Sequence, residues 1–163
     1  MYSITKKAII LGIILVILPT AVIAKNINKE SEKVCLAKAI YHESKSEPLH
    51  GKKSVAKVVL NRKHHEKFPK TICDVINQVA VVHGRKHYQF SWVPTQHKVK
   101  VNKQLWETSL DLSDDILNNK TQLPNFGPNV LYFKSVHSRV RFGKGYRLVQ
   151  RVGKQNFYEK NNV

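Results

Sequence analysis

An apolar helical stripe that ends in a carboxylate is the feature that most constrains this chain. The stripe consists of Leu36, Ala39 and Ile40, which recur at the spacing of one helix face. Glu43 lies seven, four and three residues after them, so it continues the same face. The spacing predicts a helix over about 32–45 that packs its stripe on a core and holds Glu43 at the edge of that core.

A carboxylate at the edge of a core has a chemical consequence. Partial loss of hydration raises its pKa, so it keeps its proton nearer to neutral pH. A proton-donating acid in a cleft is what the cleavage of a glycosidic bond requires. The alternative is a helix end at which Glu43 simply emerges into water.

Length and charge narrow the class of protein. The chain has 163 residues, enough for one domain with a core. Its 28 Lys and Arg against 11 Asp and Glu give a formal charge of +17. Such a charge predicts attraction to a polyanion, which could be nucleic acid, an anionic membrane or the acidic polymers of a cell envelope. The basic residues are scattered along the chain, so charge alone names no partner.

The N-terminal segment predicts export. Lys6 and Lys7 precede an uncharged run over 8–24, and Ala24 supplies a small residue at its end. This pattern is typical of a secretory signal peptide over 1–24. The competing interpretation is an uncleaved membrane anchor, since a run of about 17 residues is near the shortest that spans a bilayer. In both cases the rest is exported, which argues against a specific nucleic-acid binder. A membrane partner is expected only if the segment is retained.

Two cysteines, Cys35 and Cys73, leave two possibilities open. In an oxidising compartment they would form a disulfide between two helices, and otherwise they are reduced, buried side chains. Export favours pairing. The sequence has no CxxC motif or Cys/His cluster, and its eight histidines do not recur at metal-ligand spacing, so we expect no metal and no cofactor.

Helical patterns dominate the first two thirds of the chain, and short strands follow. After a polar leader over 25–33, the predicted helices cover about 32–45, 51–64, 71–78 and 102–119. The third begins with the capping box of Thr71 and Asp74. Residues 79–101 are predicted as a loop with a short strand ending near 89–92, and strands are predicted at 130–133 and 147–152. This order predicts an α+β domain that is mainly helical with a small C-terminal strand region.

Four segments together resemble one known family. They are Leu36 to Pro48 with its Tyr41-x-Glu43 step, Gly51 to Arg62 ending in Leu-Asn-Arg, Phe68 to Ile76 with Phe-Pro-x-Thr-Ile-Cys, and Gln89-Phe90-Ser91-Trp92. In this order and spacing they are similar to the spore-cortex-lytic type of cell-wall hydrolase, a peptidoglycan-degrading family. The C-terminal third matches that family less closely, because Lys134 and Gln155 stand where it has histidines. In the first segment, Ser44-Lys45-Ser46 replaces Ala-Arg-Gly.

The resemblance implies a lysozyme-like catalytic domain over 34–163 with Glu43 as the general acid. It implies cleavage between N-acetylmuramic acid and N-acetylglucosamine by the lytic-transglycosylase route. In that route the C6 hydroxyl of muramic acid attacks the anomeric carbon, so no second carboxylate need activate water. The sequence does not separate this route from hydrolysis. The expected partners are peptidoglycan strands, with anionic envelope polymers held by the basic surface. The substitutions at Lys134 and Gln155 motivate an alternative, a non-catalytic wall-binding or anchoring module.

Six further residues are candidates for substrate binding, and each has a structural alternative. Glu47 is four residues after Glu43, where a like charge would help keep one carboxyl protonated, or it serves only the turn before Pro48. Asn61 could bond Glu43, a sugar N-acetyl group or the backbone. The others are Gln89, Ser91 and Trp92, of a loop that either stacks a sugar or joins the core together with Phe90, and Tyr132, which either lines the cleft from a strand or packs in the core.

Overall fold

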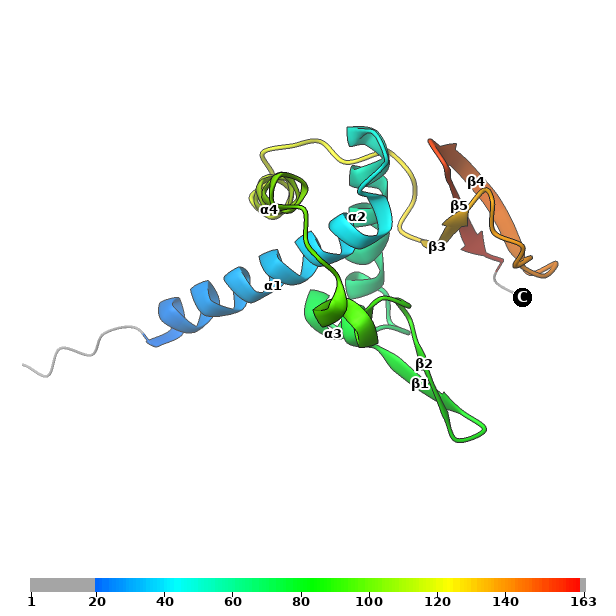
Figure 1. Ribbon diagram of the computed structural model, residues 1–163, viewed down its shortest axis with the longest axis horizontal. Helices are drawn as coiled ribbons and strands as arrows, with labels where there is room; N and C mark the ends of the chain where they lie inside the picture. The colour runs from blue at the N-terminus through cyan, green and yellow to red at the C-terminus, as the bar shows by residue number, and fades with distance from the viewer. Residues whose placement is uncertain (1–19, 162–163) are drawn as a thin grey trace, which may run out of the picture.

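A computed structural model describes residues 20–161 and, for the side chains, those from residue 32 on. It has an α+β architecture in which a helical lobe lies beside a small sheet (Figure 1). The helices are α1 (Thr20–Ser44), α2 (Leu49–His64), α3 (Ile72–Asn77), the 3₁₀ helix η1 (Val93–Lys98) and α4 (Lys103–Leu117). The strands are β1 (Val79–Val82), β2 (Arg85–Tyr88), β3 (Val130–Ser135), β4 (Tyr146–Val152) and β5 (Gln155–Lys160).

The start of α1 differs from the sequence-based expectation. The helix was predicted to begin near residue 32, and it begins at Thr20, so the polar stretch 25–33 is part of it. The segment between Thr20 and Ser44 contains neither proline nor glycine, so nothing interrupts the helical backbone. Residues 1–19 of the predicted signal peptide or membrane anchor lie outside the residues that the structure describes. Among residues 20–161, no helix is both long enough and apolar enough to cross a membrane.

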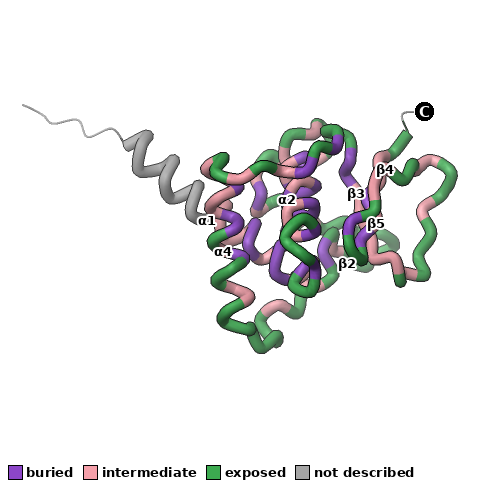
Figure 2. The backbone as a smooth tube through the Cα atoms, turned by 90° about the horizontal axis from the view of Figure 1, so that it is seen from above, coloured by how far each residue is buried: buried purple, intermediate pink, exposed green. Residues whose placement is uncertain are grey.

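The helical core forms around the stripe that the sequence predicted. Leu36, Ala39 and Ile40 are fully buried, and Figure 2 shows buried segments gathered where α1, α2 and α4 meet. The stripe packs against residues of α2, α3, α4 and the loop before η1, which are Ala56, Val59, Ile72, Val75, Ile76, Phe90, Leu112 and Ile116. Burying each large apolar side chain stabilises the fold by about 1.5–3 kcal/mol. This core fixes the rotation of α1 and therefore the side on which Glu43 emerges.

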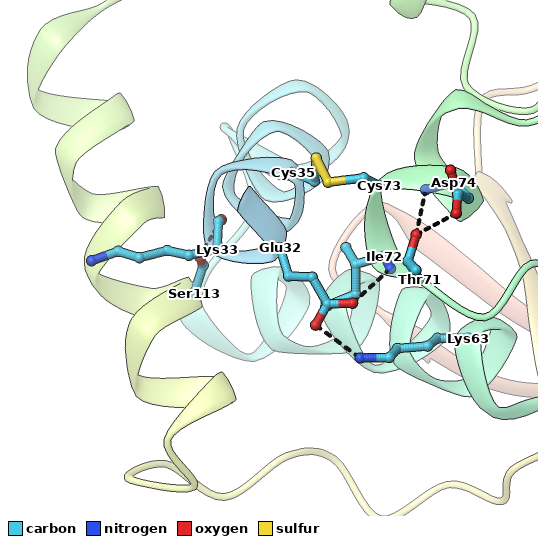
Figure 3. The surroundings of a disulfide bond; sticks show 9 residues. All are labelled: Glu32, Lys33, Cys35, Lys63, Thr71, Ile72, Cys73, Asp74 and Ser113. Carbon is cyan, nitrogen blue, oxygen red and sulfur yellow. Dashed lines mark hydrogen bonds and ion pairs between the residues drawn. A yellow bond between two sulfur atoms is a disulfide. The ribbon is translucent and has the colours of Figure 1, made fainter. Parts of the chain in front are cut away.

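A disulfide joins α1 to α3, which settles the pairing that the sequence left open (Figure 3). It links Cys35 to Cys73 across 38 positions of sequence. At the start of α3 the Thr71 hydroxyl accepts a hydrogen bond from the Asp74 amide at 3.1 Å, so the predicted capping box is confirmed. The disulfide therefore fastens α3 to α1, and the cap stabilises the first turn of α3.

The C-terminal sheet has the antiparallel order β3-β5-β4 and packs on α2. Its inner face carries Val130, Val152 and Phe157, which form a second core with Val55 and Val58. The strands predicted at 130–133 and 147–152 are confirmed as β3 and β4, whereas β5 was missed. β5 is short, and it is held between its two neighbours by pairing that the sequence pattern did not indicate.

The predicted loop over 79–101 is in part wrong. Its first part forms the antiparallel hairpin β1–β2, which projects from the helical lobe (Figure 1). His83 and Gly84 form the turn with φ of 49° and 72°, the positive values that two-residue hairpin turns favour. Every residue of β1 is exposed, so no buried face imposes the in–out alternation from which a strand is usually recognised.

Candidate active site

Glu43 occupies the last turn of α1, where the apolar stripe reaches the surface. Its carboxylate is partly buried, and its Oε1 accepts a hydrogen bond from the indole Nε1 of Trp92 at 2.8 Å. Burial raises the pKa of Glu43 above its ordinary value, while the Trp92 hydrogen bond and the nearby Arg62 charge act in the opposite direction. Burial prevails, because loss of hydration penalises the charged form. The partly buried position and the raised pKa of Glu43 are those expected from its place on the apolar stripe.

Trp92 is held between Glu43 and His42. Its ring stacks on the His42 ring with centroids 4.3 Å apart and planes inclined by 14°. Burial lowers the pKa of His42, and the charges of Lys45 and Lys38 lower it further, so the stacked imidazole is neutral at neutral pH. The two aromatic residues of the loop that was predicted to stack a sugar or join the core therefore have different surroundings. Trp92 faces the acid, whereas Phe90 is buried in the core.

Arg62 lies beneath the site and was not among the predicted residues. It is 3% exposed and donates from Nε to the carbonyl of Leu131 at 2.8 Å. Burial lowers its pKa to about 10, which leaves it charged at neutral pH, and Tyr132 and Glu43 favour the charged form. With its amide oxygen turned toward the guanidinium, Gln89 accepts from both Nη atoms at 3.3 and 3.2 Å. Arg62 therefore connects α2, β3 and the loop before Trp92.

Glu47 is placed as a structural partner. It is 6% exposed, and its Oε2 accepts a hydrogen bond from the backbone amide of Lys154 in the β4–β5 turn at 3.0 Å. The Lys52 ammonium bonds the carbonyl of Glu47. Gly153, with φ of 54°, approaches so closely that an added Cβ would lie 2.0 Å from Oε2. These contacts favour the structural alternative for Glu47 over direct binding of substrate.

The β4–β5 turn also reaches the backbone of the acid itself. Gln155 Nε2 donates to the Glu43 carbonyl at 3.2 Å, while its Oε1 is buried without a partner among the described residues. Gln155 is one of the two positions at which the family pattern that the sequence resembles has a histidine. It fixes the last turn of α1 against the sheet. Sequence reasoning noted the departure but had no signal for this contact.

Three other predicted residues take different places. The Asn61 amide donates to the carbonyls of Gly127 and Val130, each at 3.0 Å, which is the backbone role among its alternatives. Ser91 is exposed beside Trp92. Tyr132 is half-buried with its ring 5.1 Å from that of Tyr146, and it lines a hollow of about 500 Å³ between the end of α2 and the sheet. Burial raises the pKa of Tyr132.

The arrangement offers acid chemistry on one carboxyl. Glu43 is partly desolvated and reaches the surface, whereas the neighbouring Glu47 has an oxygen engaged by the β4–β5 turn. Within the described part of the chain, no three His, Cys, Asp or Glu side chains cluster closely enough to hold a metal ion. The geometry suits a proton donor that acts on a bound ligand.

Comparisons with known proteins bear on the family and the fold of this chain. The sequence profile of the Cell Wall Hydrolase family matches residues 46–158, a range that begins three residues after Glu43. The catalytic domain of Bacillus cereus SleB aligns with a TM-score of 0.50 and 24% identity, covering 78% of this chain and 89% of that one. The catalytic domain of the germination-specific lytic transglycosylase SleB from Bacillus anthracis aligns with a TM-score of 0.53 and 23% identity, covering 77% and 92%. A search of curated proteins gives no match.

Proposed function

The chain belongs to the Cell Wall Hydrolase family, and from this premise we propose that it cleaves the bond between N-acetylmuramic acid and N-acetylglucosamine in peptidoglycan, with Glu43 as general acid. The observation that carries the proposal is the Glu43 carboxyl itself. It ends a buried helical stripe, it is partly desolvated, and the Trp92 indole orients it from 2.8 Å. A donor with a raised pKa is what protonation of a leaving glycosidic oxygen needs.

The lytic-transglycosylase route suits this site. Glu43 gives its proton to the leaving oxygen, and the C6 hydroxyl of the muramic acid attacks the anomeric carbon. The proton lost from that hydroxyl returns to the Glu43 carboxylate, so one carboxyl serves both steps. An inverting or retaining hydrolase instead uses a second carboxylate across the bond, and Glu47 is engaged elsewhere. The B. anthracis structural relative, described as a lytic transglycosylase, supports the same choice.

The surrounding residues have positioning roles in this proposal. Trp92 orients the acid through its indole N–H, and Gln155 holds the carbonyl of the same residue. The Arg62 charge disfavours an excessive rise in the pKa of Glu43, so the carboxyl can also exist as the anion that takes the proton back. The charge of +17 would retain the enzyme on the anionic polymers of the wall, in keeping with a protein that acts outside the cytoplasm.

The test has two parts. Purified protein should lower the turbidity of a suspension of bacterial cell walls, and Glu43→Gln should abolish this while circular dichroism shows an intact fold. Full activity of Glu43→Gln would rule out the mechanism. Mass spectrometry of the released fragments then separates the routes, because a 1,6-anhydro end is lighter by one water than a reducing end. Binding to sacculi without release of any fragment would instead favour the non-catalytic wall-binding module.

A further inference from the structure

A hollow of about 370 Å³ is lined in part by His42, the residue before Glu43. It is bounded by α1, η1, α4 and the chain between the last two, and its lining consists of Lys38, Tyr41, His42, Gln96, Val101 and Trp106. Of these, only His42 takes part in the contacts around Glu43. The volume falls in the range of small-ligand sites, which are mostly apolar with a few placed polar groups.

The apolar side of the hollow is aromatic and held in place. Tyr41 and Trp106 meet edge to face with centroids 6.0 Å apart and planes at 78°. The Tyr41 hydroxyl accepts a hydrogen bond from the Asn102 amide at 2.9 Å, which ties α1 to the start of α4. Trp106 is only partly buried, so part of its ring is available to a ligand. An accessible indole suits the C–H face of a pyranose ring.

The polar side supplies donors and acceptors of the kind that bind sugars. Gln96 brings an amide, which pairs with hydroxyl or N-acetyl groups, and Lys38 brings an ammonium. His42 is held neutral, since burial lowers its pKa, so its ring has one nitrogen that donates and one that accepts. A hollow that combines an aromatic face with these groups matches an amino sugar better than a purely apolar ligand.

Two stacked rings lie between the hollow and the acid. His42 lines the hollow and stacks on Trp92 at 4.3 Å, and Trp92 donates to Glu43. A glycan strand whose scissile bond lies at Glu43 would therefore pass over this stack into the hollow. The stacked rings of His42 and Trp92 would then lie between the glycosidic bond at Glu43 and the sugar ring bound in the hollow.

We propose that this hollow is a saccharide subsite, in which one N-acetylhexosamine ring of the glycan strand stacks on Trp106 and bonds Gln96, Lys38 and His42. The inference rests on the proposed function for the identity of the strand. Its experiment measures binding without turnover, so that the two ideas can fail separately.

The experiment uses the Glu43→Gln protein and a β-1,4-linked tetrasaccharide of N-acetylglucosamine, with affinity measured by calorimetry. Adding Trp106→Ala should weaken binding about tenfold, through loss of the stacking face. Adding Trp106→Phe should restore most of the affinity. Gln96→Ala should weaken binding about threefold to tenfold, as expected for one lost hydrogen bond. Lys38→Gln should also weaken binding, whereas Lys57→Gln on α2, which removes the same charge outside the hollow, should leave the affinity unchanged.

The outcomes decide between the two ideas. Thermal unfolding checks each variant, and if Trp106→Ala does not fold, Gln96→Ala and Lys38→Gln carry the test. Unchanged affinity in folded Trp106→Ala, Gln96→Ala and Lys38→Gln, or no binding of the tetrasaccharide to the Glu43→Gln protein, would overturn the subsite. Breakdown of cell walls by the Glu43→Gln protein would instead overturn the proposed function and leave the binding result standing.

Discussion

The part of α1 that packs on the core has a carboxylate at each end, Glu32 at its start and Glu43 at its last turn, and the two side chains have different surroundings. At one end, Glu32 accepts from the Lys63 ammonium at 2.9 Å and from the Ile72 amide at 3.1 Å, next to the disulfide of Cys35 (Figure 3). At the other end, Glu43 receives the indole N–H of Trp92, a donor without charge. Both carboxylates are shielded from water to a large degree. The difference teaches that the donors around a carboxylate, more than its burial, decide whether it anchors a helix or moves a proton.

The largest expected effect separates the two carboxylates by function. Glu43→Gln should lower kcat on cell walls about 10³-fold, the range that a general acid contributes, and change the free energy of unfolding by less than about 1 kcal/mol. Glu32→Gln should do the reverse. It weakens the link to Lys63 and should lower the free energy of unfolding by about 1–2 kcal/mol with kcat unchanged. Steady-state kinetics and urea unfolding check both, and a large loss of kcat in Glu32→Gln would break the comparison.

Removal of the disulfide tests how firmly the anchored end holds the helix. The Cys35–Cys73 link closes a loop of 38 positions, so the double change to alanine should lower the free energy of unfolding by about 4 kcal/mol. The effect arises chiefly because the unfolded chain gains freedom. Protein that is still folded should keep its kcat, because Glu43 is two turns further along the helix. Chemical denaturation with and without reductant gives the first value, and a matched fall in kcat would contradict the separation of the two ends.

Substitution of two glycines tests whether the β4–β5 turn positions Glu43. Gly153→Ala must place a side chain at φ of 54° and next to Glu47, so it should cost about 3 kcal/mol of stability and lower kcat by displacing the β4–β5 turn. Gly84→Ala is the matched control. Its φ of 72° is equally strained, but nothing lies within 4 Å of the added Cβ, so it should cost about 1 kcal/mol and leave kcat intact. Equal effects of the two changes would show that the turn does not position the acid.

The smallest expected effect is a shift in the pH profile. The pKa of Glu43 is raised by burial, so the activity should fall on the alkaline side at a pH above the ordinary range of a glutamate. Trp92→Phe removes a hydrogen bond that favours the anion, so it should move this alkaline limb to higher pH. The sign for stability follows from proton binding. The folded state binds the Glu43 proton more tightly than the unfolded state, so stability should decrease as the pH rises through the raised pKa, and Glu43→Gln should abolish that decrease.

The controls for the pH profile are direct. Profiles of kcat for the unchanged protein and for Trp92→Phe, measured on the same cell-wall suspension, give the shift. A limb that stays in place or moves to lower pH would show that the indole does not act on the carboxyl. Unfolding curves over the same pH range measure independently how much the raised pKa of Glu43 contributes to the pH dependence of stability.

Local patterns were sufficient for much of the fold and for the place of Glu43 at the edge of the core. The helices α2, α3 and α4 follow from apolar spacing and capping residues, and Glu43 follows from its place on a stripe. Arg62 was missed as a site residue although it continues the stripe of Val55, Val58 and Val59 in the same way. From the sequence, the charge that ends the stripe of α1 was given a chemical role, and the charge that ends the stripe of α2 was given no role. The hairpin β1–β2 was missed because its exposed residues carry no burial pattern.

The sequence by itself determined which side chains reach the edge of the core, because helical periodicity and loss of hydration depend on residues within two turns of each other. Only the tertiary structure decided what those side chains meet. Trp92 is 49 positions from Glu43 and Gln155 is 112 positions from it, and Glu47 finds its amide partner 107 positions away. Contacts at such separations depend on the path of the whole chain, which brings the loop before η1 and the β4–β5 turn to the end of α1. That meeting orients the one carboxyl proposed to act as the acid and leaves the carboxyl four residues later as a structural link.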